Sequence, residues 1–162
     1  MAEPRTLFGE KRLQMTDSIR LTVESLAAYG AAHEHWALAW SGGKDSTALV
    51  TLVVWLIETA RVPAPKTLTV LYADTRLELL PLALSAETIR DELKWHGQAL
   101  AAKGCALDVR TVVAPMDKRF LVYILGRGVP PPNNNTLRWC TRQIKVDPMR
   151  AELERWLPTF TS

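Results

Sequence analysis

The hydrophobic positions of this chain fall into two kinds of segment that alternate along its length. Short, dense apolar segments rich in β-branched and aromatic residues predict strands, whereas longer segments with apolar residues three and four apart predict helices. The expected strands are residues 36–40, 67–73 and 105–113, and the expected helices are residues 12–31, 46–60, 85–103, 117–125, 138–146 and 148–156. Ser85 and Asp147 are expected to cap the helices that follow them.

Strands that alternate with helices predict a parallel sheet with helices on both of its faces. The expected fold class is therefore α/β, as a three-layer α/β/α sandwich with a mainly parallel, twisted sheet. We expect a single domain over residues 1–162, with its core at about residues 36–149. Folds of this class bind ligands at the carboxyl ends of their strands.

Composition adds a charge asymmetry to this picture. The chain has 162 residues, of which 48% are hydrophobic and 23% are charged, which supports a core and excludes a disordered tail or a small disulfide scaffold. The formal net charge is only +3. Residues 117–150 nevertheless carry seven basic and two acidic side chains, a net charge of +5. Such a segment suits either an anionic partner or a solvated basic face.

The cysteines and the apolar runs indicate a cellular compartment. Cys105 and Cys140 lack the spacing of a zinc site or of a disulfide framework. The first residues have no apolar core of the kind that signal peptides carry, and the longest apolar run, residues 48–57, is about half as long as a membrane span requires. We expect a cytoplasmic protein with reduced thiols and no membrane partner.

The turn between the first expected strand and the next helix carries the clearest chemical signal. After Trp40 it contains Ser41, Gly42, Gly43, Lys44, Asp45, Ser46 and Thr47. Backbone N–H groups at a helix N-terminus can cradle phosphates, and two glycines permit close approach and positive φ. Lys44 and the hydroxyl groups add donors, while Asp45 suits either Mg²⁺ or a helix cap. The Walker A and dinucleotide-binding patterns are both missing from the sequence.

This SGGKDST turn resembles the PP-loop of the ATP pyrophosphatases, the adenine nucleotide α-hydrolase superfamily. The resemblance implies a Rossmann-like (HUP) fold and an enzyme that binds ATP together with Mg²⁺. It also implies cleavage between the α and β phosphates to give an adenylated substrate or AMP. It assigns nucleotide binding to Trp40 and to the seven turn residues, catalytic roles to Lys44 and Asp45, and the Mg²⁺ to Asp45.

Two further elements resemble the PAPS reductase branch and its DndC-like sulfurtransferases. One is Asp74-Thr75 with Glu78, which looks like a DTxxE element. The other is the basic segment, which contains Gly126, Arg127, Gly128, Pro130 to Pro132, Arg138, Trp139, Cys140, Thr141, Lys145 and Pro148 and is similar to an RWCTxxxKxxP element. The resemblance implies nucleotide contacts from Asp74, Thr75, Arg127, Gly128 and Trp139, and catalytic roles for Arg138, Cys140 and Lys145.

Two interpretations of Cys140 stay open. Its thiolate can be stabilised by Arg138 and Arg142 and so be reactive, or the residue can act as a small buried hydrophobe. For Cys105, in an expected core strand, the second interpretation is favoured. The ECGxH tail of assimilatory PAPS reductases is missing, and one cysteine cannot supply four thiolates. An iron–sulfur cluster within this chain alone is therefore not expected.

Three functions follow as hypotheses. The leading one is an ATP pyrophosphatase of a sulfur-transfer or nucleic-acid modification pathway. The second is a reductase-like protein that binds PAPS or adenylylsulfate. The third is a nucleotide-sensing or nucleic-acid-binding subunit of a larger defence complex with little catalysis of its own. Partner subunits, nucleic acid and a homodimer are all compatible with these hypotheses.

Overall fold

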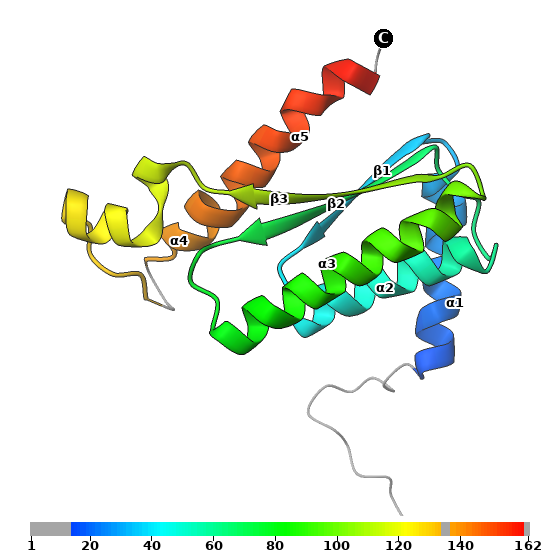
Figure 1. Ribbon diagram of the computed structural model, residues 1–162, viewed down its shortest axis with the longest axis horizontal. Coiled ribbons are helices and arrows are strands. Elements are labelled where there is room, and N and C mark those ends of the chain that lie inside the picture. Colours follow the sequence, from blue (N-terminus) through cyan, green and yellow to red (C-terminus); the bar gives the residue numbers. More distant parts are fainter. Residues whose placement is uncertain (1–13, 134–136, 161–162) are drawn as a thin grey trace, which may run out of the picture.

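The computed structural model describes residues 14–133 and 137–160, which form a mixed α/β fold with helices around a small sheet (Figure 1). The elements in chain order are α1 (Met15–Ser25), η1 (Leu26–Gly30), β1 (His35–Trp40), α2 (Lys44–Glu58), β2 (Thr67–Asp74), α3 (Leu80–Ala101), β3 (Ala106–Val113), η2 (Met116–Lys118), η3 (Val122–Gly126), α4 (Trp139–Thr141), η4 (Arg142–Val146) and α5 (Asp147–Phe160). Of the η elements, η2 is a 3₁₀ turn and the others are π-helical.

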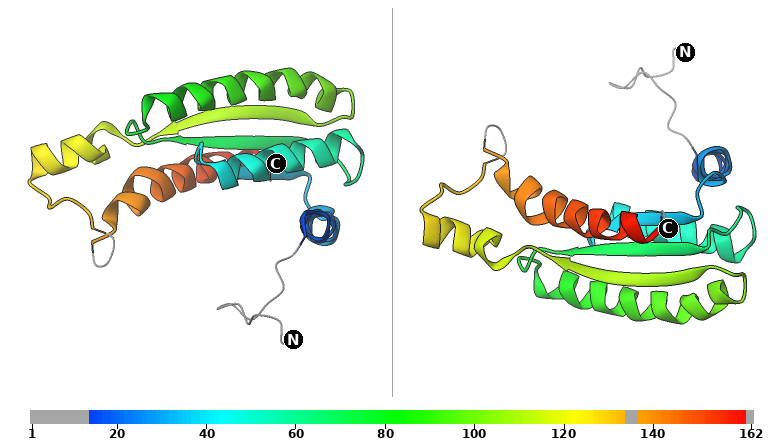
Figure 2. Two further views of the ribbon diagram at one scale, coloured as in Figure 1. Left: turned by 90° about the horizontal axis from the view of Figure 1, so that it is seen from below. Right: turned by 90° about the horizontal axis from the view of Figure 1, so that it is seen from above.

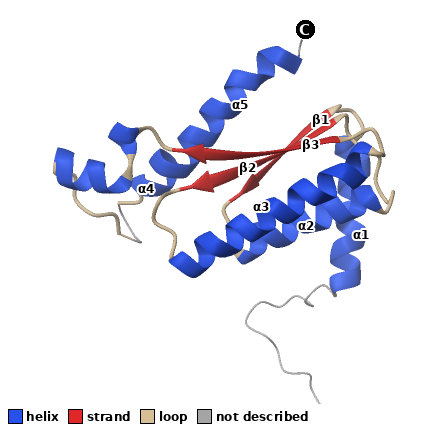
Figure 3. Ribbon diagram, viewed as in Figure 1, coloured by secondary structure: helices blue, strands red, loops and turns tan. Residues whose placement is uncertain are grey.

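The three strands form an all-parallel sheet in the order β1–β2–β3. Thr67 at the start of β2 pairs with His35 on one side and with Ala106 on the other, so the three strands begin nearly level. Their carboxyl ends consequently meet at one edge of the sheet (Figure 3). This is the edge at which α/β folds of this kind place their ligands.

The main hydrophobic core lies between the sheet and the helices α2 and α3. Alternate residues of the central strand, Leu68, Val70 and Tyr72, are buried in one cluster with Leu56 of α2 and Leu93 of α3. Period-two alternation in a strand sends these three side chains to one face of the sheet. Helix α2 is seen in front of the sheet from one side and α5 in front from the other, so the helices flank both faces (Figure 2).

The strand predictions are confirmed to within one residue at each end, because each apolar run coincides with a strand, of which the central β2 is almost entirely buried. The expected helix 12–31 corresponds to α1 and η1, with residues 12 and 13 outside the described part of the chain. Ile19 and Val23 of α1 pack against the core, as their spacing predicts. Residues 128–133, between η3 and α4, form a loop.

The predicted start of α3 at Ser85 is wrong, because the helix already begins at Leu80. Pro81 lies in its first turn, where the fixed φ of proline favours a helix and its missing N–H breaks no intrahelical bond. Ser85 therefore lies inside the helix and does not cap it. Similarly, α2 begins at Lys44, two residues before the expected helix start.

The predicted cap at Asp147 is also wrong. Residues 139–160 form one continuous helical segment, and Asp147 has helical φ and ψ of −63° and −43°. The π-helical η4 ends at Val146, two residues before Pro148. A proline ring in an α-helix clashes with the carbonyl group four residues earlier, and the wider turn relieves that clash.

Within the described residues, no helix combines the length and the apolar character needed to cross a membrane.

Gly30 provides a test of how α1 and η1 are joined to the sheet. The Trp36 indole donates hydrogen bonds to the carbonyl groups of Gly30 (3.2 Å) and His33 (3.1 Å), and a Cβ atom on Gly30 would overlap the indole ring. We expect Gly30→Ala to lower the free energy of unfolding by about 1–3 kcal/mol through overpacking, measured by urea denaturation. Gly126→Ala is the matched control, since its Cβ would meet only Val122, at 3.7 Å. Equal stability of the two variants would contradict this packing.

Candidate functional site

The segments singled out from the sequence follow the carboxyl ends of the strands. The glycine turn, residues 41–43, follows β1, and the Asp74-Thr75 element ends β2. The helical turns η2 and η3 follow β3 and lie beyond the arrowheads of the sheet, beside α4 (Figure 1). Four parts of the sequence therefore meet around one edge.

The glycine turn has a defined conformation. Gly42 has a φ of +73°, and a Cβ atom at this position would come within 3.3 Å of the Tyr72 ring. Glycine is therefore required both for its backbone conformation and for lack of space. The Ser46 hydroxyl accepts a hydrogen bond from the Ser41 N–H (3.2 Å) and donates one to the Gly43 carbonyl (3.1 Å). Ser41 and Ser46 also share a hydroxyl–hydroxyl hydrogen bond of 3.0 Å.

Helix α2 begins in this turn with unpaired backbone donors. Its first backbone hydrogen bond runs from the Thr47 N–H to the Gly43 carbonyl, at 2.9 Å. No side chain caps the helix, and within the described residues no acceptor serves the N–H groups of residues 44–46. Lys44 and Asp45 are exposed in the first turn of this 15-residue helix. The N-terminus of α2 thus presents three donors and a positive dipole end to solvent.

Trp40 lies beneath the turn. Its side chain is fully buried, and its indole N–H donates to the Thr47 hydroxyl at 2.8 Å. Its ring packs on Tyr72 with a centroid separation of 4.8 Å. Trp40 and Thr47 therefore fix the turn from below, so a nucleotide contact from the Trp40 ring stays a prediction.

The DTxxE-like element is folded into a tight, hydrogen-bonded turn. Glu78 accepts hydrogen bonds from the Thr75 hydroxyl (2.6 Å), from the Thr75 N–H (3.2 Å) and from the Leu77 N–H (3.2 Å). Burial raises the pKa of Glu78, but the hydrogen bonds from these donors together lower it by more. The pKa of Glu78 therefore lies below its ordinary value. Asp74 pairs with Arg76 at 3.1 Å and accepts its N–H at 2.9 Å.

A pocket of about 330 Å³ joins this element to the basic segment. Its lining residues are Thr75, Leu77, Glu78, Phe120, Cys140, Thr141, Ile144 and Lys145. Cys140 and Lys145 are both half-buried. The basic segment is tied to the residues after β3, because the Gln143 side-chain amide donates to the Lys118 carbonyl at 3.0 Å. Two elements that are about 65 residues apart in the chain thus form the walls of one cavity.

The other candidates of the basic segment make local contacts outside this lining. Arg127 pairs with Asp117 at 3.0 Å. Gly128 has a φ of +65° with open space around it. Arg138 is exposed at the residue before α4.

Trp139 belongs to an aromatic cluster. Its ring lies 5.7 Å from that of Phe120 and 4.8 Å from that of Tyr123, and its N–H donates to the Pro130 carbonyl at 3.1 Å. The cluster holds α4 against η3. Stacking of Trp139 on an adenine base therefore stays a prediction, because part of the ring already has aromatic neighbours.

The two cysteines have different surroundings. Cys105 is fully buried and burial raises its pKa, which confirms that it behaves as a core residue. Cys140 opens toward the pocket, and both thiols are free. Across residues 14–133 and 137–160, no three histidine, cysteine, aspartate or glutamate side chains gather as a metal site would require.

Two residues near the turn were not assigned a role from the sequence. Tyr72 packs against both Gly42 and Trp40, and burial, with the nearby Glu78 and Asp74, raises its pKa. The Arg90 guanidinium lies over the Tyr72 ring and donates to Thr111 at 2.9 Å, while its Nε atom is buried without a hydrogen-bond partner. Tyr72 stands within a recognisable motif, but no local pattern reveals Arg90, whose partners are 18 and 21 residues away.

Comparison with models of protein families, with curated proteins and with solved structures gives no significant match for this chain. Its function must therefore be argued from its own residues and their geometry.

A substitution of Glu78 tests how much the hydrogen bonds of this turn contribute to the free energy of unfolding. The lowered pKa of Glu78 means that the carboxylate stabilises the fold above its ordinary value of 4.5, and that this stabilisation is lost as the pH falls through the folded pKa. We expect Glu78→Gln to lower the free energy of unfolding at pH 7 by about 1–2 kcal/mol and to flatten its pH dependence below 4.5. Urea denaturation across this pH range measures both effects. Glu92→Gln, at an exposed position of α3, is the control. A pH dependence below 4.5 that is as steep in Glu78→Gln as in the wild type would contradict the assignment.

Proposed function

We propose that this chain binds Mg·ATP at the carboxyl edge of its sheet and cleaves the bond between the α and β phosphates. The observation that carries the proposal is the meeting, at one edge, of a glycine turn with unpaired N–H donors and a pocket that contains Lys145 and Cys140. Their position at the carboxyl edge of one parallel sheet supports a common function in a PAPS reductase-like ATP pyrophosphatase.

The glycine turn is suited to hold the β and γ phosphates. The unpaired N–H groups of residues 44–46 point out of the N-terminus of α2, where an anion is favoured by both hydrogen bonds and the helix dipole. Lys44 adds an exposed ammonium group to the same turn. Because Ser41, Gly42 and Gly43 are already fixed by packing and hydroxyl bonds, little ordering is needed when the phosphates bind.

The donor set near the turn fits Mg²⁺ that arrives with the nucleotide. Mg²⁺ in phosphate sites is held by one or two carboxylates together with the phosphates and water. Asp45 provides an exposed carboxylate in the first turn of α2, with no ion-pair partner within the described residues. The Mg²⁺ would neutralise charge on the phosphates. Asp45 would hold it there, which also accounts for a carboxylate at a phosphate-binding turn.

The pocket beside Thr75 is suited to the α phosphate and the acceptor. Lys145 lines it and can stabilise the negative charge that develops on the α phosphate in the transition state. Water or an acceptor attacks the α phosphorus, its bond to the bridging oxygen breaks, and pyrophosphate leaves. Arg138, exposed at the residue before α4, would provide a second cation for the phosphates. We propose that the three-stranded sheet is the centre of a Rossmann-like, three-layer architecture of the PP-loop type.

Asp45 tests the proposal directly. With α-labelled ATP and Mg²⁺, we expect the protein to release AMP and pyrophosphate, and Asp45→Asn to lower the rate of AMP formation about 100-fold or more. Product identity is read by thin-layer chromatography. Asp91→Asn, at an exposed position of α3, is the matched control and should keep the full rate. ADP as the product, or an unchanged rate in Asp45→Asn, would refute the proposal.

A sulfonucleotide substrate is the second candidate, favoured by the half-buried Cys140 thiol in the same pocket as Lys145. If ATP is the true ligand, it should bind more tightly than adenosine 3′,5′-bisphosphate in isothermal titration calorimetry with Mg²⁺ present. Tighter binding of the bisphosphate, weakened by Lys145→Ala, would favour PAPS or adenylylsulfate instead.

A further inference from the structure

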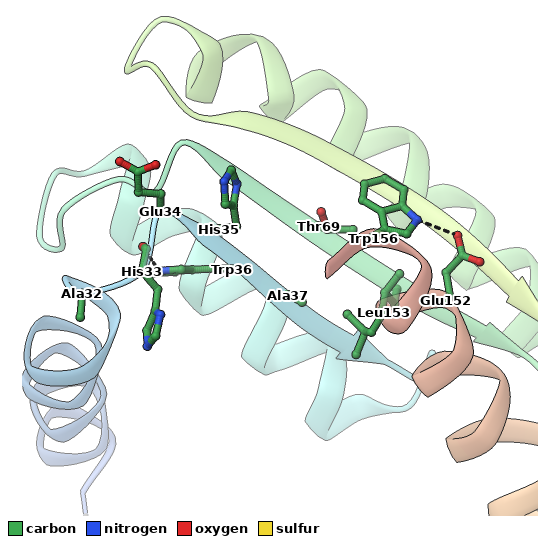
Figure 4. Close-up of a pocket in the computed structure, with 11 residues that line it drawn as sticks. Ala32, His33, Glu34, His35, Trp36, Ala37, Thr69, Glu152, Leu153 and Trp156 are labelled. Atoms are coloured by element: carbon green, nitrogen blue, oxygen red, sulfur yellow. Dashed lines mark hydrogen bonds between the residues drawn. The ribbon is translucent and has the colours of Figure 1, made fainter. Parts of the chain in front are cut away.

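A second cavity lies on the face of the sheet that α5 covers. It has a volume of about 410 Å³ and lies between α5 and the first half of the sheet (Figure 4). Its lining residues are Ala32, His33, Glu34, His35, Trp36, Ala37, Thr69, Leu71, Glu152, Leu153 and Trp156. This volume is in the range of small-molecule sites. It shares no lining residue with the pocket that contains Cys140.

The floor of the cavity is a flat part of the sheet. Ala37 of β1 and Thr69 of β2 are register partners, so their small side chains lie next to each other on the same face. Leu71 continues this floor along β2. Small side chains on a pleated surface leave room for a planar group to lie against the sheet.

Thr69 gives the floor its one specific polar feature. The residue is only 7% exposed, and its hydroxyl has no hydrogen-bond partner in the described part of the chain. Within the described residues, Arg90 Nε is the one buried side-chain polar atom that lacks a partner, so the Thr69 hydroxyl is open to the cavity, where it can both donate and accept a hydrogen bond. Because Thr69 lines the cavity, a bound molecule is the partner that its position allows.

One wall of the cavity is fixed by a network on α5. The Trp156 indole donates to Glu152 at 3.2 Å, as the dashed line in Figure 4 marks. The Arg110 guanidinium of β3 lies over the Trp156 ring and reaches Glu152 at 3.4 Å. Leu153 stands beside them on the same helix. This wall is aromatic and apolar, and it is held in place before any ligand binds.

The charges around the cavity are balanced. Glu34 pairs with Lys66 at 2.7 Å. Glu152 pairs with Arg110 and also with Arg155, each at 3.4 Å. Both carboxylates of the lining are thus paired, so they place no unpaired negative charge in the cavity.

We propose that this cavity binds a neutral small molecule that has a planar ring and one polar atom, which hydrogen-bonds to the Thr69 hydroxyl. The ring lies on Ala37 and Leu71 beside Trp156. The proposal does not depend on nucleotide binding at the glycine turn, because the two sites are formed by different residues.

Indole is a suitable probe, since it is neutral, planar and carries one N–H donor. In a titration followed by ¹H–¹⁵N correlation spectra of the labelled protein, we expect saturable shifts of the amide signals of Ala37, Thr69, Leu71 and Leu153. A dissociation constant in the millimolar range or tighter is expected for a molecule of this size. Thr69→Val, which replaces the hydroxyl with a methyl group, should weaken binding about three- to tenfold.

Two further variants make the test decisive. Ala37→Leu fills the floor and should abolish the shifts, while Thr88→Val makes the same chemical change as Thr69→Val on exposed α3 and should leave them unchanged. If indole shifts these signals equally in wild type and Thr69→Val, or if the shifts never saturate, the proposal is refuted. It is also refuted if, without indole, the same signals shift with protein concentration, because a second copy of the chain would then occupy the face.

Discussion

Parallel hydrogen bonding between three strands is the constraint on which the rest of this molecule depends. Parallel neighbours need a crossover at each step, and α2 and α3 supply both crossovers. The crossovers bury the side of β2 that carries Leu68 and Val70. The same arrangement places all three strand ends at one edge, so each connection that leaves a strand enters the same region. The site is therefore a consequence of the direction of the strands.

At that edge the hydrogen bonds between strands end, and the turns that follow the strands are held by hydrogen bonds from side chains instead. Ser46 supports the glycine turn after β1, and Glu78 supports the turn after β2. Tyr72 lies between the two turns, in contact with Trp40 and close to Gly42. Each turn is thus held rigidly by groups of its own, while the donors at the start of α2 remain available. Rigid support with available donors is what a binding site requires before its ligand arrives.

Much of the fold could be predicted from the sequence because the strands are short, apolar and bounded by breakers. The helix starts were harder, since Ser85 has the chemistry of a cap but Pro81 already begins the helix, and Asp147 precedes a proline that a π-helical turn accommodates. The contact of Thr75 with the Cys140 region could not be derived from spacing. It depends on how the chain after β3 returns to the sheet. The Thr69 hydroxyl at the floor of the second cavity could not be singled out either, because strand alternation predicts the face on which it lies but not what lies above it.

Residues 139–160 form a single rod that serves two cavities. Its first turns carry Cys140 and Lys145 into the pocket beside Thr75, and its later turns carry Leu153 and Trp156 over the sheet. These two groups are separated by roughly 20 Å of continuous helix. Because the segment is uninterrupted, its two ends are mechanically coupled, and the π-helical turn ahead of Pro148 is the place at which it can bend. A displacement along its axis therefore changes the widths of both cavities together. The π-helical turn near Lys145 sets the angle about the helix axis between the side chains that face one cavity and those that face the other.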